Sequence, residues 1–278
     1  MGTLTRKYIS PAIAMIVLIL LLVIMLFPFF IIAINAFKTA PEYAARGPLV
    51  LPSTISFDSI IEFWERVKFS GKLLNSFIIS ISVAVLATGL SLLNAYALGI
   101  GKIKGMSVFL IIFVVANTLP HESLAYPLYY IVKAIGLYDT KISVIIVFTV
   151  IQSAFGTYLL SNVFSAFPRA LLEAAKIDGA GKGQILRSIV FPMSIPTLSV
   201  LFTFFFIWTW NEFFLPLIML VSNKNQTVPI ALTVTQGQHN MDVTMASASA
   251  LLGVLPCIIF FIIFQRTLTK GITAGSIK

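Results

Sequence analysis

The sequence has few charged residues, one cysteine and two histidines. Only 10% of its 278 residues are charged and 58% are hydrophobic, whereas about 25% of the residues of a soluble domain are charged. This composition excludes an ordinary soluble domain and favours an integral membrane protein with several spans. Because Cys257 is the only cysteine, an intrachain disulfide is excluded. The histidines, His121 and His239, have no metal-ligand spacing around them, so we expect no metal site.

The sequence also lacks any cluster of basic residues, although its formal net charge is +9. Lysine and arginine occur singly between apolar runs, whereas surfaces that bind nucleic acid gather them in a patch. We therefore expect no nucleic-acid partner. No nucleophile–base–acid constellation is present either, so we predict that the chain is not an enzyme and has no catalytic residues.

Long apolar runs predict an all-α polytopic membrane protein with six transmembrane helices in a single domain, residues 1–278. A helix needs about 20 apolar residues to cross the hydrocarbon core. The runs cover residues 11–37, 73–100, 107–132, 142–164, 197–221 and 243–265. The first run is longer than the roughly 7–15 residues of a signal-peptide core, so we expect it to be retained. Prolines inside the runs predict kinks, and they are Pro28, Pro120, Pro127, Pro216 and Pro256.

The distribution of basic residues predicts the orientation of the chain. If the N-terminus is cytoplasmic, 11 of the 19 lysine and arginine residues fall in the segments on the inside. Short cytoplasmic loops carry this excess in membrane proteins. We therefore expect both termini to be cytoplasmic, with residues 266–278 as a cytoplasmic tail. Residues 165–196 then form the largest cytoplasmic segment.

The cytoplasmic segment 165–196 contains the stretch EAAKIDGAGKG, which superficially resembles a phosphate-binding loop. Such a loop needs a glycine five residues before the Gly-Lys pair and Ser or Thr after it, but Lys176 and Gly183 stand at these positions. The pattern instead predicts a helix-turn-helix. Pro168 suits a first helical turn, Gly179 suits a left-handed helix end, and Pro192 would stop the second helix. Periodicity alone does not distinguish a connector lying on lipid headgroups from a surface that docks another protein.

The same residues carry a family resemblance. Glu173-Ala174-Ala175, three residues, Gly179, nine residues, then Ile189 and Pro192 resembles the EAA loop of permease subunits of binding-protein-dependent ABC importers. Phe191 stands where leucine is usual. Further stretches similar to the sugar-importer (MalG-like) branch are residues 75–76, 95–97, 136–140, 210–213 and 271–275.

The resemblance implies a fold and a set of partners. The fold would be that of a type I ABC importer permease, with the helix-turn-helix as its coupling loop. The partners would be a second, MalF-like permease, two cytoplasmic ATPase subunits, an extracytoplasmic sugar-binding protein, a sugar or oligosaccharide, and membrane lipid. This chain would bind no cofactor, since ATP and Mg²⁺ would lie on the ATPase subunits. The location would be the bacterial cytoplasmic membrane.

The resemblance also implies where the ATPase subunits would bind. The coupling residues would be Glu173, Ala174, Ala175, Asp178, Gly179, Ala180, Ile189 and Pro192. A further contact would come from the tail residues Thr273, Ala274, Gly275 and Lys278.

Polar residues within the spans are candidates for the translocation path, because ionisable groups in the bilayer are costly and usually functional. Indole rings stack on sugar faces, while acids and amides bind hydroxyl groups. The candidates are Asn117, Glu122, Trp208, Asn211 and Glu212. An alternative function is a proton-coupled secondary carrier in which Glu122, His121 and Glu212 form a proton relay. Such a carrier would need no ATPase.

Overall fold

The computed structural model describes the backbone of residues 11–101, 103, 105–235 and 242–274. This described part contains helices and no strands, which confirms the all-α prediction. The chain forms two compact units: residues 1–66 with 234–254, and residues 67–233 with 255–278. The longest helix, α13 (Val243–Ala274), contributes residues to both units.

The first unit contains α1 (Pro11–Ala36), α2 (Ala40–Arg46) and α3 (Asp58–Arg66). The loop after α1 is closed by Lys38, whose side chain is fully buried. The Lys38 ammonium donates to Asn35 Oδ1 and to the carbonyl of Gly47, each at 2.9 Å, and burial lowers the Lys38 pKa. This buried cation therefore fixes the loop between α1 and α3 through neutral oxygen acceptors.

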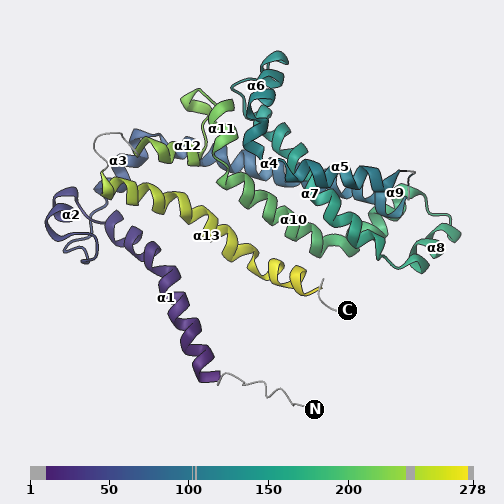
Figure 1. The fold of residues 1–278 in the computed structure, drawn as a ribbon, viewed down its shortest axis with the longest axis horizontal. Coiled ribbons are helices and arrows are strands. Elements are labelled where there is room, and N and C mark those ends of the chain that lie inside the picture. The colour runs from purple at the N-terminus through teal and green to yellow at the C-terminus, as the bar shows by residue number, and fades with distance from the viewer. Residues whose placement is uncertain (1–10, 102, 104, 236–241, 275–278) are drawn as a thin grey trace, which may run out of the picture. The chain divides into compact units, whose positions relative to one another are not determined.

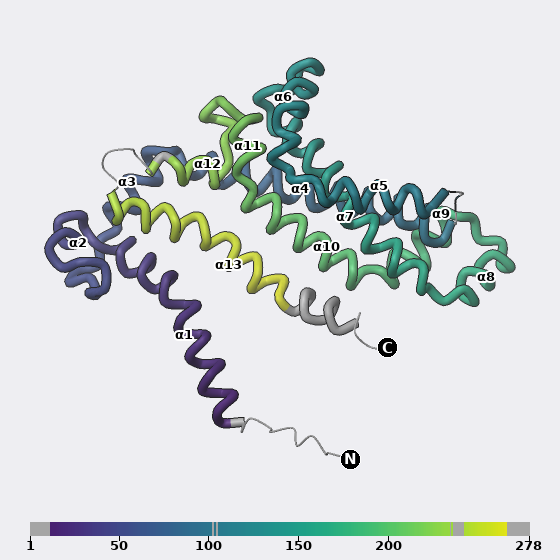
Figure 2. The backbone as a smooth tube through the Cα atoms, viewed as in Figure 1, coloured from purple at the N-terminus to yellow at the C-terminus, as the bar shows by residue number. Residues whose placement is uncertain are grey.

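The second unit is built on three helices that pack side by side, as Figures 1 and 2 show: α4 (Phe69–Ala95), α7 (Lys141–Ser165) and α10 (Phe191–Asn211). Small residues allow α4 and α7 to approach closely. A Cβ atom added at Gly156 of α7 would lie only 2.2 Å from Ser91 Oγ of α4. Small residues are the usual contact residues between membrane helices, so this seam forms the centre of the unit.

The remaining elements of the second unit are short. They are the π-turn η1 (Tyr96–Ile100), α5 (Met106–Thr118), η2 (His121–Leu124), α6 (Ala125–Ala134), α8 (Arg169–Ile177), α9 (Lys182–Ile185), the π-turn η3 (Leu186–Val190), α11 (Phe214–Met219), η4 (Asn223–Asn225) and α12 (Val228–Leu232). The 3₁₀ turn η5 (Thr233–Thr235) follows α12.

Five helices in the described part are long and apolar enough to cross a membrane, and a sixth span arises if α5 and α6 are counted as one broken span. The sequence predicted one helix over 107–132. The structure instead bends by 96° between α5 and α6. Leu119 is extended (φ −70°, ψ 128°) because the ring of Pro120 disfavours a helical residue before it.

The predicted span 197–221 is also interrupted. Its helix α10 ends at Asn211, Glu212 is extended (ψ 127°), and α11 is a separate short helix. Pro216 has no N–H to donate to the carbonyl of Glu212, four residues earlier, and its ring would clash with that carbonyl. The proline therefore breaks the helix one turn before its own position.

The prediction that Pro192 stops the second helix of the 165–196 segment is wrong. A continuous helical stretch runs from Lys182 to Asn211. The π-turn η3 directly precedes α10, and Pro192 occupies the first turn of α10. Because a π-turn shifts hydrogen bonding to the fifth residue, the missing N–H of Pro192 does not end the helix.

Asp139 joins the start of α7 to the segment after α11. Asp139 Oδ1 accepts from the N–H of Ser222 at 3.0 Å, Oδ2 accepts from the Ser222 hydroxyl, and Asn225 Nδ2 donates to the Asp139 carbonyl at 2.6 Å. Burial of Asp139 raises its pKa, but the hydrogen bonds from Ser222 and its neighbours outweigh burial, so the pKa lies below the usual 3.8. The folded protein therefore stabilises the charged form.

We predict that Asp139→Ala lowers the free energy of unfolding by about 1–3 kcal/mol at pH 7, since the N–H and hydroxyl of the half-buried Ser222 lose their acceptor. The depressed pKa makes this contribution complete above the unfolded-state pKa of about 3.8. It is lost as the pH falls through the lower folded-state pKa. The detergent-purified wild type should therefore unfold at a higher temperature than Asp139→Ala at pH 7, and this difference should become smaller below about pH 4. The same difference in unfolding temperature at every pH would contradict the assignment to the Asp139 carboxylate.

Candidate coupling and translocation sites

The turn inside segment 165–196 is a helix end of the Schellman type. Gly179 is left-handed (φ +80°), its N–H donates to the Lys176 carbonyl at 3.0 Å, and the N–H of Ala180 donates to the Ala175 carbonyl at 2.9 Å. This bonding pattern satisfies the last carbonyl groups of α8 and favours glycine at the left-handed position. The prediction that a first helix ends at Gly179 is confirmed.

The helix α8 uses one face for packing and leaves the other free. Leu172 and Ala175 are buried, while Glu173, Ala174 and Asp178 are exposed. Ile177, directly before the turn, is 86% exposed. The free face therefore combines small, charged and apolar side chains, and its carboxylates can accept charge-assisted hydrogen bonds from another protein.

Glu173 also borders a recess of about 180 Å³ where α8 meets the ends of η1 and α7. Arg169 and Lys176 border the same recess. On the far side of the turn, Tyr96 Oη donates to the Lys182 carbonyl at 2.9 Å, which ties the start of α9 to the end of α4. This hydrogen bond therefore ties the residues after the turn to the helical core.

The other proposed coupling residues lie apart from this exposed face or outside the described part. Ala180 and Ile189 are half-buried, and Pro192 is exposed at the start of α10. The tail positions Thr273 and Ala274 belong to the end of α13, but their side chains, and Gly275 and Lys278 altogether, lie outside the described residues.

Trp208 and Asn211 lie near the end of α10. Trp208 is 43% exposed, and its ring stacks on Phe204 with centroids 5.7 Å apart and an interplanar angle of 7°. Asn211 is exposed; its Nδ2 donates to the Ile207 carbonyl at 2.8 Å and lies 3.9 Å from Cys257 Sγ on α13. An exposed ring and an exposed amide are thus presented within one turn of helix.

The structure brings the two helix breaks together. Glu212, in the break after α10, interacts electrostatically with His121 and Glu122 in the break after α5. The Glu212 carboxylate also accepts from the N–H groups of Phe214 and Leu215 at the start of α11. Asn117 is half-buried in the last turn of α5. Pro120 and Pro216 were the sequence signals for these breaks, but neither shows that they meet.

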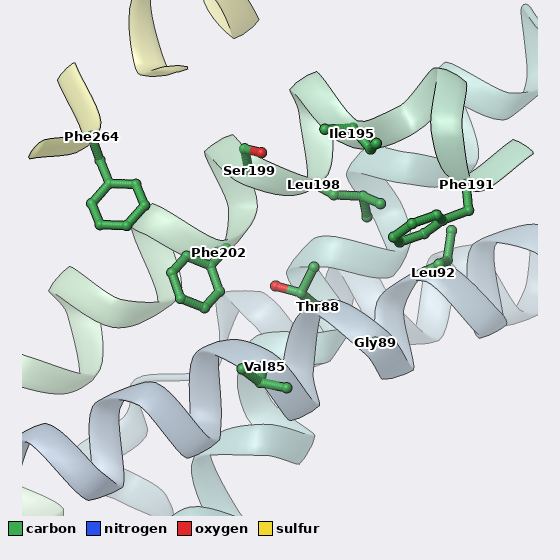
Figure 3. A pocket seen from close by; sticks show the side chains of 10 residues that line it. All are labelled: Val85, Thr88, Gly89, Leu92, Phe191, Ile195, Leu198, Ser199, Phe202 and Phe264. Carbon is green, nitrogen blue, oxygen red and sulfur yellow. The ribbon is translucent and has the colours of Figure 1, made fainter. Parts of the chain in front are cut away.

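A cavity of about 360 Å³ between α4 and α10, shown in Figure 3, has an almost wholly apolar lining. Phe191 forms part of its wall, so the residue that departs from the EAA-loop pattern contributes to this cavity. Thr88 and Ser199 are its only polar lining side chains. A larger cavity of about 540 Å³ beside Trp210 has Ser70 as its one side chain with a hydroxyl group. Sugars need many hydrogen-bond partners, so neither cavity suits a sugar.

The chain is similar to known membrane transport proteins. Residues 102–273 match the family described as "Binding-protein-dependent transport system inner membrane component". The chain is 31% identical over 240 residues (86% of the chain and 88% of the relative) to "Trehalose transport system permease protein SugB" of Mycobacterium tuberculosis. It is 29% identical over 263 residues, 94% of both chains, to "Inner membrane ABC transporter permease protein YcjP" of Escherichia coli.

A solved structure supports the predicted fold. A chain from a bacterial ABC transporter involved in import of the acidic polysaccharide alginate superposes with a TM-score of 0.79 at 21% sequence identity. The match covers 92% of this chain and 95% of the other. The prediction of an ABC importer permease fold is therefore confirmed.

Proposed function

Because the chain belongs to the family of binding-protein-dependent transport system inner membrane components, we propose that it is the transmembrane permease subunit of an ATP-driven sugar or oligosaccharide importer. The family match over residues 102–273 carries this proposal. The relative named for trehalose transport supports a sugar as substrate. As proposed, the subunit sits in the bacterial cytoplasmic membrane with both termini inside, where it has no catalytic role.

In this proposal the chain shares the translocation path with a second permease. An extracytoplasmic binding protein delivers the sugar, and two ATPase subunits, which hold ATP and Mg²⁺, bind α8 from the cytoplasm. Coupling is then mechanical: movement of the bound α8 is passed to the helical core through the turn at Gly179 and the Tyr96–Lys182 bond. The exposed face of α8 leaves Glu173, Ala174 and Asp178 accessible for this docking.

The proposed path passes Trp208, Asn211 and Glu212, with Glu122 and Asn117 at the neighbouring break. The exposed indole and amide near the end of α10 offer the stacking and hydrogen bonding that a sugar requires. The rival reading as a proton-coupled carrier uses His121, Glu122 and Glu212, which the structure does bring together. The comparisons do not favour it, since the relatives are ABC transporter permeases.

Reconstitution tests the function. The subunits that copurify with this chain are placed in proteoliposomes with the binding protein, and sugar uptake is measured with ATP inside or with a proton gradient alone. We expect uptake to require ATP and every partner. Uptake by this chain alone, driven by a proton gradient, would overturn the proposal.

The only cysteine of the chain provides a direct probe of the path. Cys257 Sγ lies 3.9 Å from Asn211 Nδ2 and is half-buried. If Asn211 lines the path, saturating transported sugar should slow maleimide labelling of Cys257 in the assembled importer, because the sugar covers the thiol. Labelling is followed by mass spectrometry of this chain, with Cys257→Ser as the blank. An unchanged labelling rate would exclude Asn211 from the path.

A further inference from the structure

A second apolar hollow lies in the elbow between α5, α6 and α7. We call it the elbow notch; its volume is about 450 Å³. Its walls include Ile112 of α5, Leu128 and Ile131 of α6, and Ile146 and Val150 of α7. Ser143 is its only polar lining residue, and the Ser143 hydroxyl is already bonded to the Thr140 carbonyl at 2.7 Å. The notch therefore offers a ligand no hydrogen-bond partner and suits a hydrocarbon.

Several side chains that line the notch are exposed on the surface of the chain. Ile112 is 55% exposed and Val150 is 60% exposed, although both lie on helices of membrane-spanning character. In a bilayer such side chains face lipid or another subunit, because no water fills an apolar hollow at that depth.

The helix α6 that roofs the notch has two distinct faces. Leu128, Ile131 and Val132 face the notch. The other face carries three tyrosines and a lysine, Tyr126, Tyr129, Tyr130 and Lys133. Tyr126 is 72% exposed. Tyrosine and lysine opposite an apolar face are typical of a helix that lies in the membrane–water interface, and the 96° bend turns α6 across the direction of α5 (Figure 1).

The geometry of this roof is fixed by local bonds. The N–H of Gly136 donates to the Lys133 carbonyl at 3.1 Å, and the N–H of Leu137 donates to the Val132 carbonyl at 3.0 Å. The rings of Tyr129 and Tyr138 meet edge to face at 5.2 Å. The notch is therefore preformed, so a ligand is not required to shape it.

Lys133 provides a charge beside the notch, on the tyrosine-bearing face of α6. Its ammonium donates to Tyr129 Oη at 3.3 Å and lies 5.5 Å from the centre of the Tyr129 ring. Within the part of the chain that the structure describes, no carboxylate forms a salt bridge with Lys133. Val132 lines the notch, and Lys133 follows it about 100° around the helix. A lipid whose acyl chain fills the notch would bring its phosphate to this lysine.

We infer that the elbow notch binds an anionic phospholipid, with one acyl chain under α6 and the phosphate at Lys133. A helix of a partner subunit fits less well. Such a helix is about 10–12 Å wide with its side chains, whereas the hollow between α5, α6 and α7 has a volume of only about 450 Å³. A flexible acyl chain fits such a volume, whereas a continuous spanning helix does not.

Photocrosslinking tests the acyl-chain position. The membrane-extracted protein, with the subunits that accompany it, is placed in nanodiscs that contain phosphatidylglycerol with a diazirine in mid-chain. We expect adducts concentrated on Ile112, Ile131, Ile146 and Val150, and a several-fold loss of these adducts in Ile146→Trp, which fills the notch. Ile142→Trp is the matched control, since Ile142 is on the same helix, is 55% exposed and does not line the notch.

The headgroup is tested by competition between phosphatidylglycerol and phosphatidylcholine. Lys133→Gln should reduce the preference for the anionic lipid by about fivefold, the effect of one lysine at an anionic surface, whereas Lys133→Arg should retain it. Adducts spread evenly over the lipid-facing helices, equal losses in both tryptophan variants, or a notch protected by a partner subunit would each overturn the inference.

Discussion

Glu173→Lys is expected to leave the chain in the membrane while it abolishes sugar uptake driven by ATP. Glu173 is exposed on the free face of α8, and the recess it borders is also bordered by Arg169 and Lys176. The substitution places a third cation there and removes the only carboxylate lining the recess. Loss of one partner of a charged pair at an interface costs about 2–5 kcal/mol, so we expect uptake to fall by about thirtyfold or more.

The control is Glu65→Lys, the same change at an exposed glutamate of α3. Both variants should insert and accumulate like the wild type, but only Glu173→Lys should lose the copurifying ATPase and the sugar-stimulated hydrolysis. If the ATPase still copurified and hydrolysis still responded to sugar in Glu173→Lys, the docking role of α8 would be wrong.

Two glycine-to-alanine substitutions are expected to have opposite effects on stability. A Cβ atom at Gly156 would lie 2.2 Å from Ser91 Oγ and 2.9 Å from a ring carbon of Phe205, whereas one at Gly89 of α4 meets nothing within 4 Å. Overpacking costs about 1–3 kcal/mol. Alanine in place of glycine in an open helical position gains about 0.8–1.0 kcal/mol. Gly156→Ala should therefore lower the free energy of unfolding in mixed micelles, and Gly89→Ala should raise it.

The seam between α4 and α7 can be checked by rescue. Ser91→Gly removes the hydroxyl and the Cβ atom that crowd position 156. The double variant Ser91→Gly with Gly156→Ala should therefore have a higher free energy of unfolding than the sum of the two single changes predicts. Strict additivity, or a stabilising Gly156→Ala, would contradict the close approach of the two helices.

Local sequence signals predicted the features that depend on neighbouring residues. The end of α8 at Gly179 follows from a left-handed position that needs glycine, and the structure has that conformation with both Schellman bonds. The all-helical fold follows from apolar runs of membrane length. Both depend on residues within one continuous stretch of the chain, and the sequence shows these directly.

Features that depend on distant residues could not be predicted. Pro120 indicated a kink, but the size of the 96° turn depends on how α6 packs, which involves α11. Pro192 indicated a helix end, which the π-turn η3 avoids. The electrostatic interaction between Glu212 and Glu122 joins residues 90 positions apart, and no periodicity in the sequence indicates that they lie near each other. The same holds for the bonds between Asp139 and Ser222.

The central claim is that α8 connects this chain to a separate ATPase. Ile177 is 86% exposed at the tip of α8, so benzoylphenylalanine at position 177 reports directly on what this tip touches. In membranes that hold the whole importer, we expect adducts between position 177 and the ATPase subunit, in a yield that changes when ATP is added. Adducts with lipid alone, and none with an ATPase under either condition, would contradict this claim.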